Sequence, residues 1–452
     1  MGLNSSLFYD QSGETTLLRR ISLSDEQIQN ARNKKDTLLR EVKPKLTDSF
    51  GVPVKHWLQG SYKNHTLVRP VIKGDEFDID IGLYMLCDAE SSRMSPIACK
   101  KENRRVLGDF CGVSQDAELQ EPKTNCERIS YPGSLHIDIP LYYYDERNDT
   151  CKLASERDEW SDSDPKAFQD WFDSCLSEYS ESQRAQVRRI IKYLKVWTLL
   201  KGQKDGVSVP SIAITILVTK DIIFGEDDDD VFARSAVHFA DYILDNQTLE
   251  NPAQGGDVLG FSDSDYQVIR QRAKTLRRVC EYIDQCNDSF RQYLLWSATF
   301  EHMFPPFAER QVEVGKKTNL PAKTIPPKIS VRLEDRYGNR KSEDLEESVS
   351  AYRTDKLRFT VQNAADYAPE ATVHWVVRNQ NTEAEKVNDL GHTSVQDVTA
   401  ERYEDCAYAG IHYMECFIRQ KGEIAGVASV KVRVSSIRRP DRNPPKRRHF
   451  KR

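Results

Sequence analysis

The chain has 452 residues, of which 38% are hydrophobic and 30% are charged, a composition typical of a folded protein of two or three domains. Its net charge is −5, and its last sixteen residues alone carry +7, so the rest is acidic. This argues against a globally basic nucleic-acid binder but not against a local basic patch. No apolar run approaches the length that crosses a bilayer, which excludes an integral membrane protein.

The amino terminus and the cysteines bear on the compartment. The first residues lack the basic and apolar regions of a secretory signal, although Gly2 and Ser6 match the loose pattern of N-myristoylation. The ten cysteines show no paired spacing and no zinc-type grouping with histidine. We therefore expect reduced thiols and a cytoplasmic protein.

The first 302 residues are predicted to form three segments of different secondary structure. Residues 1–45 are predicted to form a helical segment that packs on the core, with a helix beginning after Ser24. Residues 46–160 show short strands separated by polar loops. Residues 161–302 are predicted to be mostly helical, and residues 270–290 show the periodicity of one long amphipathic helix.

The carboxy-terminal part follows a proline-rich linker at residues 303–327. After the linker, apolar residues alternate with polar ones, which predicts an antiparallel β-sandwich over residues 328–436. The turn between two of its strands is expected at residues 337–339. The basic tail, residues 437–452, is predicted to be disordered.

Two runs of charge are predicted to face solvent. The acidic run from Asp227 to Asp230 has no strand context and is interpreted as a solvated loop. The basic residues between Arg270 and Arg278 are interpreted as the wet face of a helix.

A sharp turn is predicted after the strand that ends at Leu58. Gln59, Gly60 and Ser61 lead from that strand into a presumed helix. A Gly-Ser turn at a helix start presents backbone N–H groups and a hydroxyl, which suit a phosphate. Gln59 and Lys63 are candidate phosphate contacts because they flank this turn.

Two predicted strands each carry carboxylates on one face. In residues 77–81, Asp78 and Asp80 alternate with apolar residues, and in residues 135–139, Asp138 does the same. If the strands are neighbours, three carboxylates converge, a crowding that divalent cations relieve. Two Mg²⁺ ions, with Mn²⁺ as the alternative, would then support phosphoryl transfer. Taken singly, each aspartate is better explained as part of a solvated strand face.

These motifs resemble a known family. Gly60-Ser61, Asp78-x-Asp80 and Asp138 resemble the signature of the polymerase-β-like nucleotidyltransferases. The surrounding strings are similar to the bacterial cGAS/DncV-like nucleotidyltransferases (CD-NTases, or SMODS proteins), which make cyclic oligonucleotide messengers in anti-phage defence. The resemblance covers roughly residues 45–300. It implies an α+β fold, with a polymerase-β-like core at residues 46–160 and a helical lobe that completes the nucleotide cleft, followed by the β-sandwich.

The same resemblance suggests two further nucleotide contacts. Lys195-Val196-Trp197 resembles the Lys-x-Trp helix of this superfamily, and Val209-Pro210-Ser211 resembles the start of the next helix. In relatives this lysine and serine contact the triphosphate. The alternative explanation from the residues alone is a solvated helix position for Lys195 and a helix N-cap for Ser211.

The sandwich resembles the AGS-C sensor domain, most clearly from Tyr408 to Cys416. This implies a sensor ligand or a regulatory protein as a partner. The zinc insertion with which the animal relative binds DNA has no counterpart, so direct activation by duplex DNA is not implied.

We therefore expect an enzyme that joins nucleoside triphosphates, ATP among them, through 3′–5′ linkages with release of pyrophosphate, and closes the product into a ring. Asp78 and Asp80 would bind both metal ions, and Asp138 would bind the metal that activates the attacking 3′-hydroxyl. The product would act on a cyclic-nucleotide-activated effector. Two alternatives stay open: linear addition of nucleotides to RNA ends or protein side chains, and a non-catalytic nucleotide-binding module.

Overall fold

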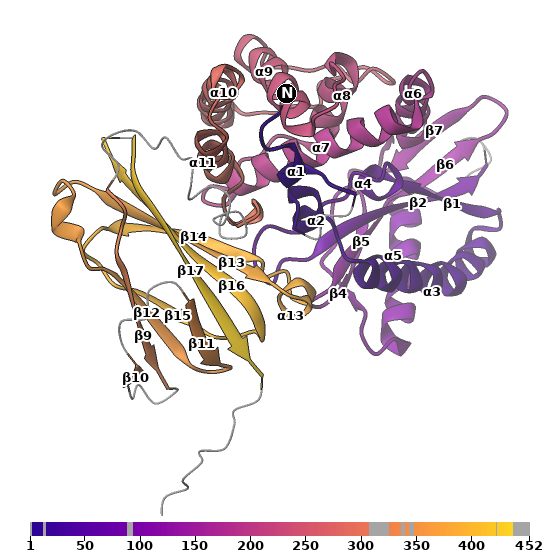
Figure 1. Cartoon of the computed structure of the whole chain (residues 1–452). Coiled ribbons are helices and arrows are strands. Elements are labelled where there is room, and N and C mark those ends of the chain that lie inside the picture. The colour runs from indigo at the N-terminus through magenta and orange to yellow at the C-terminus, as the bar shows by residue number, and fades with distance from the viewer. Residues whose placement is uncertain are drawn as a thin grey trace, which may run out of the picture. The chain divides into compact units, whose positions relative to one another are not determined.

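The computed structural model describes residues 2–11, 15–87, 94–306, 325–335, 340–342, 348–421 and 423–436, without the side chains of residues 340–342. These residues form two compact units, divided between Phe300 and Glu301 (Figure 1). Most of the predicted linker, the predicted turn at residues 337–339 and the predicted disordered tail lie outside the described residues. The boundaries predicted after residues 45 and 160 fall inside the first unit and stay predictions.

The first unit combines helices with one large sheet. Its helices are α1 (Ser5–Phe8), α2 (Leu17–Ile21), α3 (Asp25–Phe50), α4 (Gly60–Lys63), α5 (Pro96–Val113), α6 (Pro165–Ser177), α7 (Glu181–Gly202), α8 (Ser211–Asp221), α9 (Asp228–Asp245), α10 (Asp263–Gln285) and α11 (Ser289–Phe300). Its strands are β1 (Val54–Gln59), β2 (Phe77–Leu86), β3 (Glu118–Leu119), β4 (Glu127–Tyr131), β5 (Leu135–Ile139), β6 (Leu141–Asp145), β7 (Thr150–Ala154) and β8 (Trp160–Asp162).

The long helix α3 begins where the sequence predicted. The Ser24 side chain accepts a hydrogen bond from the Gln27 backbone, and the Gln27 side chain accepts one from the Ser24 backbone, a capping box that fixes the start. The helix continues to Phe50 and ends at Gly51, whose φ of +66° is the left-handed conformation that glycine adopts without strain.

Strand β2 lies at the centre of the sheet. It pairs antiparallel with β1, and parallel with β5 along its first half and β6 along its second. The full order is β3-β4-β5-β2-β6-β7-β8, with β1 on β2. Helices α3 and α5 cover one face, where their apolar side chains share a core with those of β2 and β5 (Figure 1). The polar side chains of β2 and β5 therefore gather on the other face.

The helical region is built around α7, which contacts α2, α8, α9 and α11. The single helix predicted over residues 270–290 is wrong in its limits. Helix α10 ends at Gln285, and α11 begins at Ser289. The carboxylate of Asp288 accepts hydrogen bonds from the backbone N–H groups of Phe290 and Arg291, so it caps a new helix there.

The acidic run at Asp227 to Asp230 is not a solvated loop. Helix α9 begins at Asp228, and the side chains of Asp228 and Asp229 are each only 2% exposed. Asp228 accepts hydrogen bonds from Arg189 at 2.6 and 2.9 Å and from the Tyr193 hydroxyl at 3.0 Å. The prediction fails because a buried carboxylate becomes stable once such partners, 35 residues and more away in sequence, surround it.

The second unit is a β-sandwich. Its elements are η1 (Glu301–Met303), β9 (Ile329–Glu334), β10 (Arg340–Ser342), β11 (Ser348–Tyr352), β12 (Lys356–Val361), η3 (Ala364–Asp366), β13 (Thr372–Gln380), α13 (Thr382–Lys386), β14 (Gly391–Asp397), β15 (Arg402–Asp405), β16 (Gly410–Gln420) and β17 (Glu423–Ser435). A four-stranded sheet, β10-β9-β12-β15, and a five-stranded sheet, β11-β17-β16-β13-β14, bury one shared apolar core. The strands are antiparallel as predicted, except that β11 pairs parallel with β17.

No helix in the described part of the chain combines the length and the apolar character that a bilayer crossing needs. All ten cysteines are described and free, in agreement with the predicted reduced thiols.

Candidate active site

The Gly-Ser turn joins β1 to α4 beside the carboxylates of β2. Gly60 has a φ of +59°, and a Cβ atom at this position would lie 2.5 Å from Oδ2 of Asp80. Glycine is therefore required twice, for the backbone conformation and for the space. This close approach puts the backbone of the turn directly against the Asp80 carboxylate.

The three predicted aspartates lie on adjacent strands. In the parallel pair β2–β5, Asp80 lies opposite Asp138 and Asp78 lies opposite His136. Residues Phe77, Ile79 and Ile81 point into the core with 4% exposure or less, as the alternation predicted. The strand pairing on which the acidic site depends is therefore present.

An arginine that the sequence reasoning missed lies among these carboxylates. Arg128 of β4 donates to both oxygens of Asp138, from Nε at 2.6 Å and from Nη2 at 2.8 Å. Its Nη2 also lies 2.8 Å from Oδ1 of Asp78. Lys123 adds a second cation 3.3 Å from Asp138. The signal was present in the sequence, because a hairpin of β4 with β5 places Arg128 directly opposite Asp138.

The pKa values of Asp80 and Asp138 consequently shift in opposite directions. Burial, followed by the charges of Asp138 and Asp78, raises the pKa of Asp80 to about 6. Burial acts in the same direction on Asp138, but the hydrogen bonds and charge of Arg128, aided by Lys123, outweigh it and lower the pKa of Asp138. At neutral pH, Asp80 is the carboxylate of this face whose charge the protein neutralises least.

His136, next to Asp78 on the acidic face, pairs with the carboxylate of Glu76. Its Nε2 lies 2.7 Å from Glu76, and its Nδ1 lies 3.4 Å from Asp78. Glu76 also accepts hydrogen bonds from the Ser130 hydroxyl and the Gly133 backbone. His136 therefore lies beside Asp78, on the face where the alternation predicted it, and its Nδ1 is also 3.4 Å from Nη1 of Arg128.

Lys195 connects the helical region to the Gly-Ser turn. Its Nζ donates to the Ser61 hydroxyl at 2.6 Å and to the Thr66 carbonyl at 2.9 Å. The residue is 5% exposed, so the alternative of a solvated helix position is wrong. Burial, with a smaller contribution from the charge of Lys192, lowers the pKa of Lys195 to about 7.

The remaining predicted contacts are placed differently. Gln59 is buried, and its amide donates to the Tyr84 hydroxyl at 2.6 Å, packing so tightly on Gly82 that a Cβ there would lie 2.1 Å from it. Lys63 is exposed in the last turn of α4. Ser211 is the exposed first residue of α8 and Pro210 is its N-cap, so the alternative explanation of Ser211 as an N-cap is wrong. Among the described contacts, none joins the side chains of Lys63 or Ser211 to the acidic face, whereas Gln59 lies opposite Asp80 in the pairing of β1 with β2.

The donor set suits a divalent cation. It consists of carboxylate oxygens, the ligands that Mg²⁺ and Mn²⁺ prefer, and the charge of Asp80 lacks a directly bonded cation among the described residues. In the described residues, however, no three His, Cys, Asp or Glu side chains close around one point, and Arg128 bridges Asp78 and Asp138. The chemistry of the residues therefore fits a metal, provided that Arg128 yields one of its two carboxylates.

Two parts of the chain match known domain families, and nearly the whole chain matches a curated protein. The family model "Cyclic GMP-AMP synthase DncV-like, nucleotidyltransferase domain" matches residues 54–142, and "Adenylyl/Guanylyl and SMODS C-terminal sensor domain" matches residues 309–435. A cyclic GMP-AMP synthase of Escherichia albertii is 32% identical over 437 residues, 96% of this chain and 97% of that protein.

More distant similarities cover less. A cyclic GMP-AMP synthase of Vibrio cholerae serotype O1 is 24% identical over 45% of this chain and 55% of that protein. The crystal structure of Vibrio cholerae DncV in its GTP-bound form aligns with a TM-score of 0.47 at 20% identity, over 65% of this chain and 79% of that chain.

A Gly-Ser turn and paired aspartates on a sheet matched by a nucleotidyltransferase domain define a nucleotidyltransferase. The expectation of an enzyme is therefore confirmed. The chain belongs to the cyclic GMP-AMP synthase DncV-like family of cyclic dinucleotide synthases and carries an AGS-C sensor domain. The resemblance inferred from the motifs and the predicted fold class are both confirmed.

Proposed function

We propose that this enzyme joins nucleoside triphosphates through 3′–5′ linkages and closes the product into a cyclic dinucleotide. ATP and GTP are the first substrates to test, because the relative that spans nearly the whole chain is named a cyclic GMP-AMP synthase. In each step a 3′-hydroxyl attacks the α-phosphorus of a triphosphate, and the bond to pyrophosphate breaks. The observation that carries the proposal is the register that sets Asp80 against Asp138 beside Asp78 and the Gly-Ser turn.

The acidic residues and the Gly-Ser turn are proposed to bind different parts of the reacting complex. Asp78, Asp80 and Asp138 would hold two Mg²⁺ ions, with Mn²⁺ as the alternative, which when bound offset the triphosphate charge and lower the pKa of the attacking hydroxyl. The backbone of Gly60 and the hydroxyl of Ser61 would bind the donor triphosphate.

Three other groups shape this site. Lys195 would add a positive charge from the helical region to the bound triphosphate, since it already donates to Ser61. Ser211 and Lys63 stay proposed contacts to the substrate. Gln59 is proposed to act through packing, because its amide is taken by Tyr84. Arg128 would keep Asp78 and Asp138 ionised and oriented until the substrate and its metal ions enter.

The biological setting proposed is anti-phage signalling in the cytoplasm. The cyclic product would activate an effector protein, and the AGS-C domain would bind a regulatory ligand or protein that favours the active state. Such a signal must bind the active and inactive states with different affinity, because equal affinity shifts no equilibrium. Comparing the response to infection with and without residues 328–452 tests this role.

The reaction is tested with ATP, GTP and Mg²⁺ by measuring pyrophosphate release and the resistance of the product to phosphatase. The wild type should give a product that phosphatase leaves intact, since a ring has no terminal phosphate. Asp138→Asn should lower turnover by about a thousandfold or more, whereas Asp162→Asn, an exposed aspartate on β8 of the same sheet, should not. A phosphatase-sensitive product would favour the linear alternative instead.

A further inference from the structure

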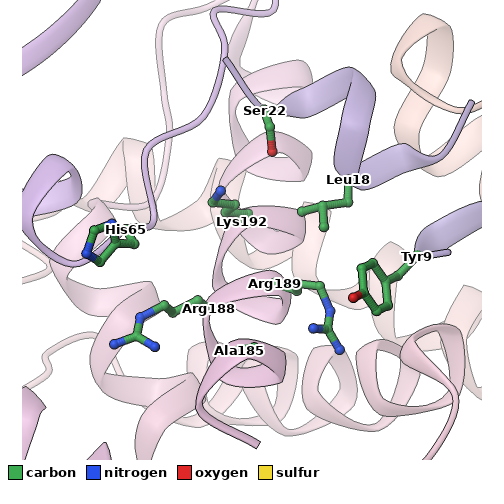
Figure 2. Close-up of a pocket in the computed structure, with 8 residues that line it drawn as sticks. All are labelled: Tyr9, Leu18, Ser22, His65, Ala185, Arg188, Arg189 and Lys192. Atoms are coloured by element: carbon green, nitrogen blue, oxygen red, sulfur yellow. The ribbon is translucent and has the colours of Figure 1, made fainter. Parts of the chain in front are cut away.

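A cavity of about 350 Å³ lies beside α7, on residues that the proposed reaction does not use. Figure 2 shows Arg188, Arg189 and Lys192 along α7, with Tyr9 and the segment around Ser22 across from them. His65, in the loop that follows α4, lies near Arg188 and Lys192. The volume is in the range of sites for mononucleotide-sized molecules.

The cavity has an excess of positive charge. None of the described residues that line it is acidic. Arg189 is offset by Asp228 and lies with its guanidinium 4.0 Å from the centre of the Tyr9 ring. Arg188 donates only to backbone carbonyls, those of Asn64 and Arg184. Two cations, Arg188 and Lys192, therefore lack a bonded carboxylate in the described part of the chain.

Lys192 is the clearest sign of a missing partner. It makes no hydrogen bond or ion pair with the described residues. Burial lowers the pKa of Lys192 to about 8, and no neighbouring carboxylate raises it again. The pKa of His65 is also lowered, by burial first and then by the charges of Arg188, Lys192 and Lys63. The charge of Asp173 opposes this lowering at His65 and acts in the same sense on Arg188, but the pKa of Lys192 has no such compensation. A partly buried ammonium without an anionic partner is stabilised poorly, since it loses part of its hydration.

The cavity is connected to the Gly-Ser turn through one short loop. Arg188 Nε donates to the carbonyl of Asn64 at 3.1 Å, and Lys195 Nζ donates to the carbonyl of Thr66 at 2.9 Å. Between them, His65 has a φ of +58°, a left-handed conformation that is strained for a residue other than glycine. Arg188 and Lys195 therefore bind the backbone on either side of His65. They lie one helical turn before and one turn after Lys192 on α7.

We propose that this cavity is a second anion site, which binds a small phosphate-bearing molecule between Arg188 and Lys192 and transmits its occupancy to the triphosphate site through residues 64–66. Phosphate is favoured because two cations without a directly bonded carboxylate match a multiply charged anion. A nucleic acid is disfavoured because the chain outside its last sixteen residues is acidic and the cavity is small. The coupling, but not the binding, rests on the proposed function.

Binding is tested on the full chain without divalent cations, with inorganic tripolyphosphate as the probe and calorimetry as the readout. The wild type and Lys204→Gln, an exposed lysine just beyond the same helix, should bind alike. Lys192→Met, which keeps the aliphatic stem, should bind about tenfold more weakly or worse. Without the probe, Lys192→Met should melt at a higher temperature than the wild type, because a partly buried charge without an ion-pair partner is gone.

Equal affinity of Lys192→Met and the wild type for tripolyphosphate would overturn the site. So would stabilisation by a short DNA or RNA duplex that depends on Lys192 while tripolyphosphate has no effect. The coupling is then measured as the change in apparent KM for triphosphate when the probe is added, which Lys192→Met should abolish. A chain that binds the probe through Lys192 but joins no nucleotides would contradict the proposed function and leave the anion site standing.

Discussion

Asp80→Asn should stabilise the metal-free protein, because the ionised Asp80 is the least compensated charge of the acidic face. Its pKa rises from an ordinary value of 3.8 to about 6, through burial and through the charges of Asp138 and Asp78. Each pKa unit corresponds to about 1.4 kcal/mol, so the ionised carboxylate costs the folded state about 3 kcal/mol at pH 8. The neutral amide of asparagine removes this cost and keeps the shape.

The pH dependence has a definite sign. Since the folded-state pKa lies above the unfolded value, folded Asp80 holds its proton more tightly, and this stabilisation is complete below pH 3.8. It is lost as the pH rises through about 6. The advantage of Asp80→Asn should therefore be absent near pH 4 and reach its maximum above pH 7.

Thermal unfolding in EDTA measures the effect. At pH 8 the gain of about 3 kcal/mol should appear as an increase in Tm of about 5 °C. Asp48→Asn, an exposed position on α3, is the matched control and should not change the Tm. Mg²⁺ should raise the Tm of the wild type more than that of Asp80→Asn, which should also lose pyrophosphate release. A destabilised variant, or a difference that is the same at pH 4 and pH 8, would refute the assigned electrostatics.

Lys195→Met should raise the apparent KM for triphosphate about tenfold, with a smaller change in kcat, because ground-state and transition-state phosphates both feel its charge. Arg128→Gln should lower the free energy of unfolding in EDTA by about 2 kcal/mol, because Asp138 loses its bidentate partner, and Mg²⁺ should restore part of it. Glu415→Leu should cost the second unit about 3 to 5 kcal/mol in urea unfolding, because Arg378, like Glu415 0% exposed, loses the carboxylate 2.9 Å from its Nε. Removal of residues 437–452 should leave pyrophosphate release unchanged.

The controls and opposing outcomes are specific to each variant. A changed product with an unchanged KM in Lys195→Met would place that lysine near a base instead of the phosphates. Insensitivity of Arg128→Gln to Mg²⁺ would mean that its carboxylates do not bind the ion. Glu370→Leu, at an exposed position of the second unit, should not change the free energy of unfolding. If it lost as much stability as Glu415→Leu, the loss in Glu415→Leu could not be attributed to the buried ion pair. Loss of pyrophosphate release without residues 437–452, in a still-folded protein, would show that they take part in catalysis.

Local pattern determined a large part of this protein. The alternation in residues 77–81 and 135–139 fixed which side chains are buried and left Asp78, Asp80 and Asp138 on the opposite side. Ser24 with Gln27 set the start of α3, and the period of two after the linker indicated the sandwich. These features could be predicted because each depends on residues within a few positions of one another, where side-chain geometry follows directly from the backbone period.

Only the tertiary structure decided what those carboxylates meet. The pairing of β2 with β5 brings Asp80 to Asp138 across 58 positions of sequence, and it brings Asp78 within reach of Arg128, which lies opposite Asp138 in the hairpin of β4 with β5. Lys195 of α7 donates to Ser61, and Asp228, which was predicted to be solvated, is buried against Arg189. Burial and pKa depend on every charge within several ångströms, whatever its place in the chain, so no local pattern contains them.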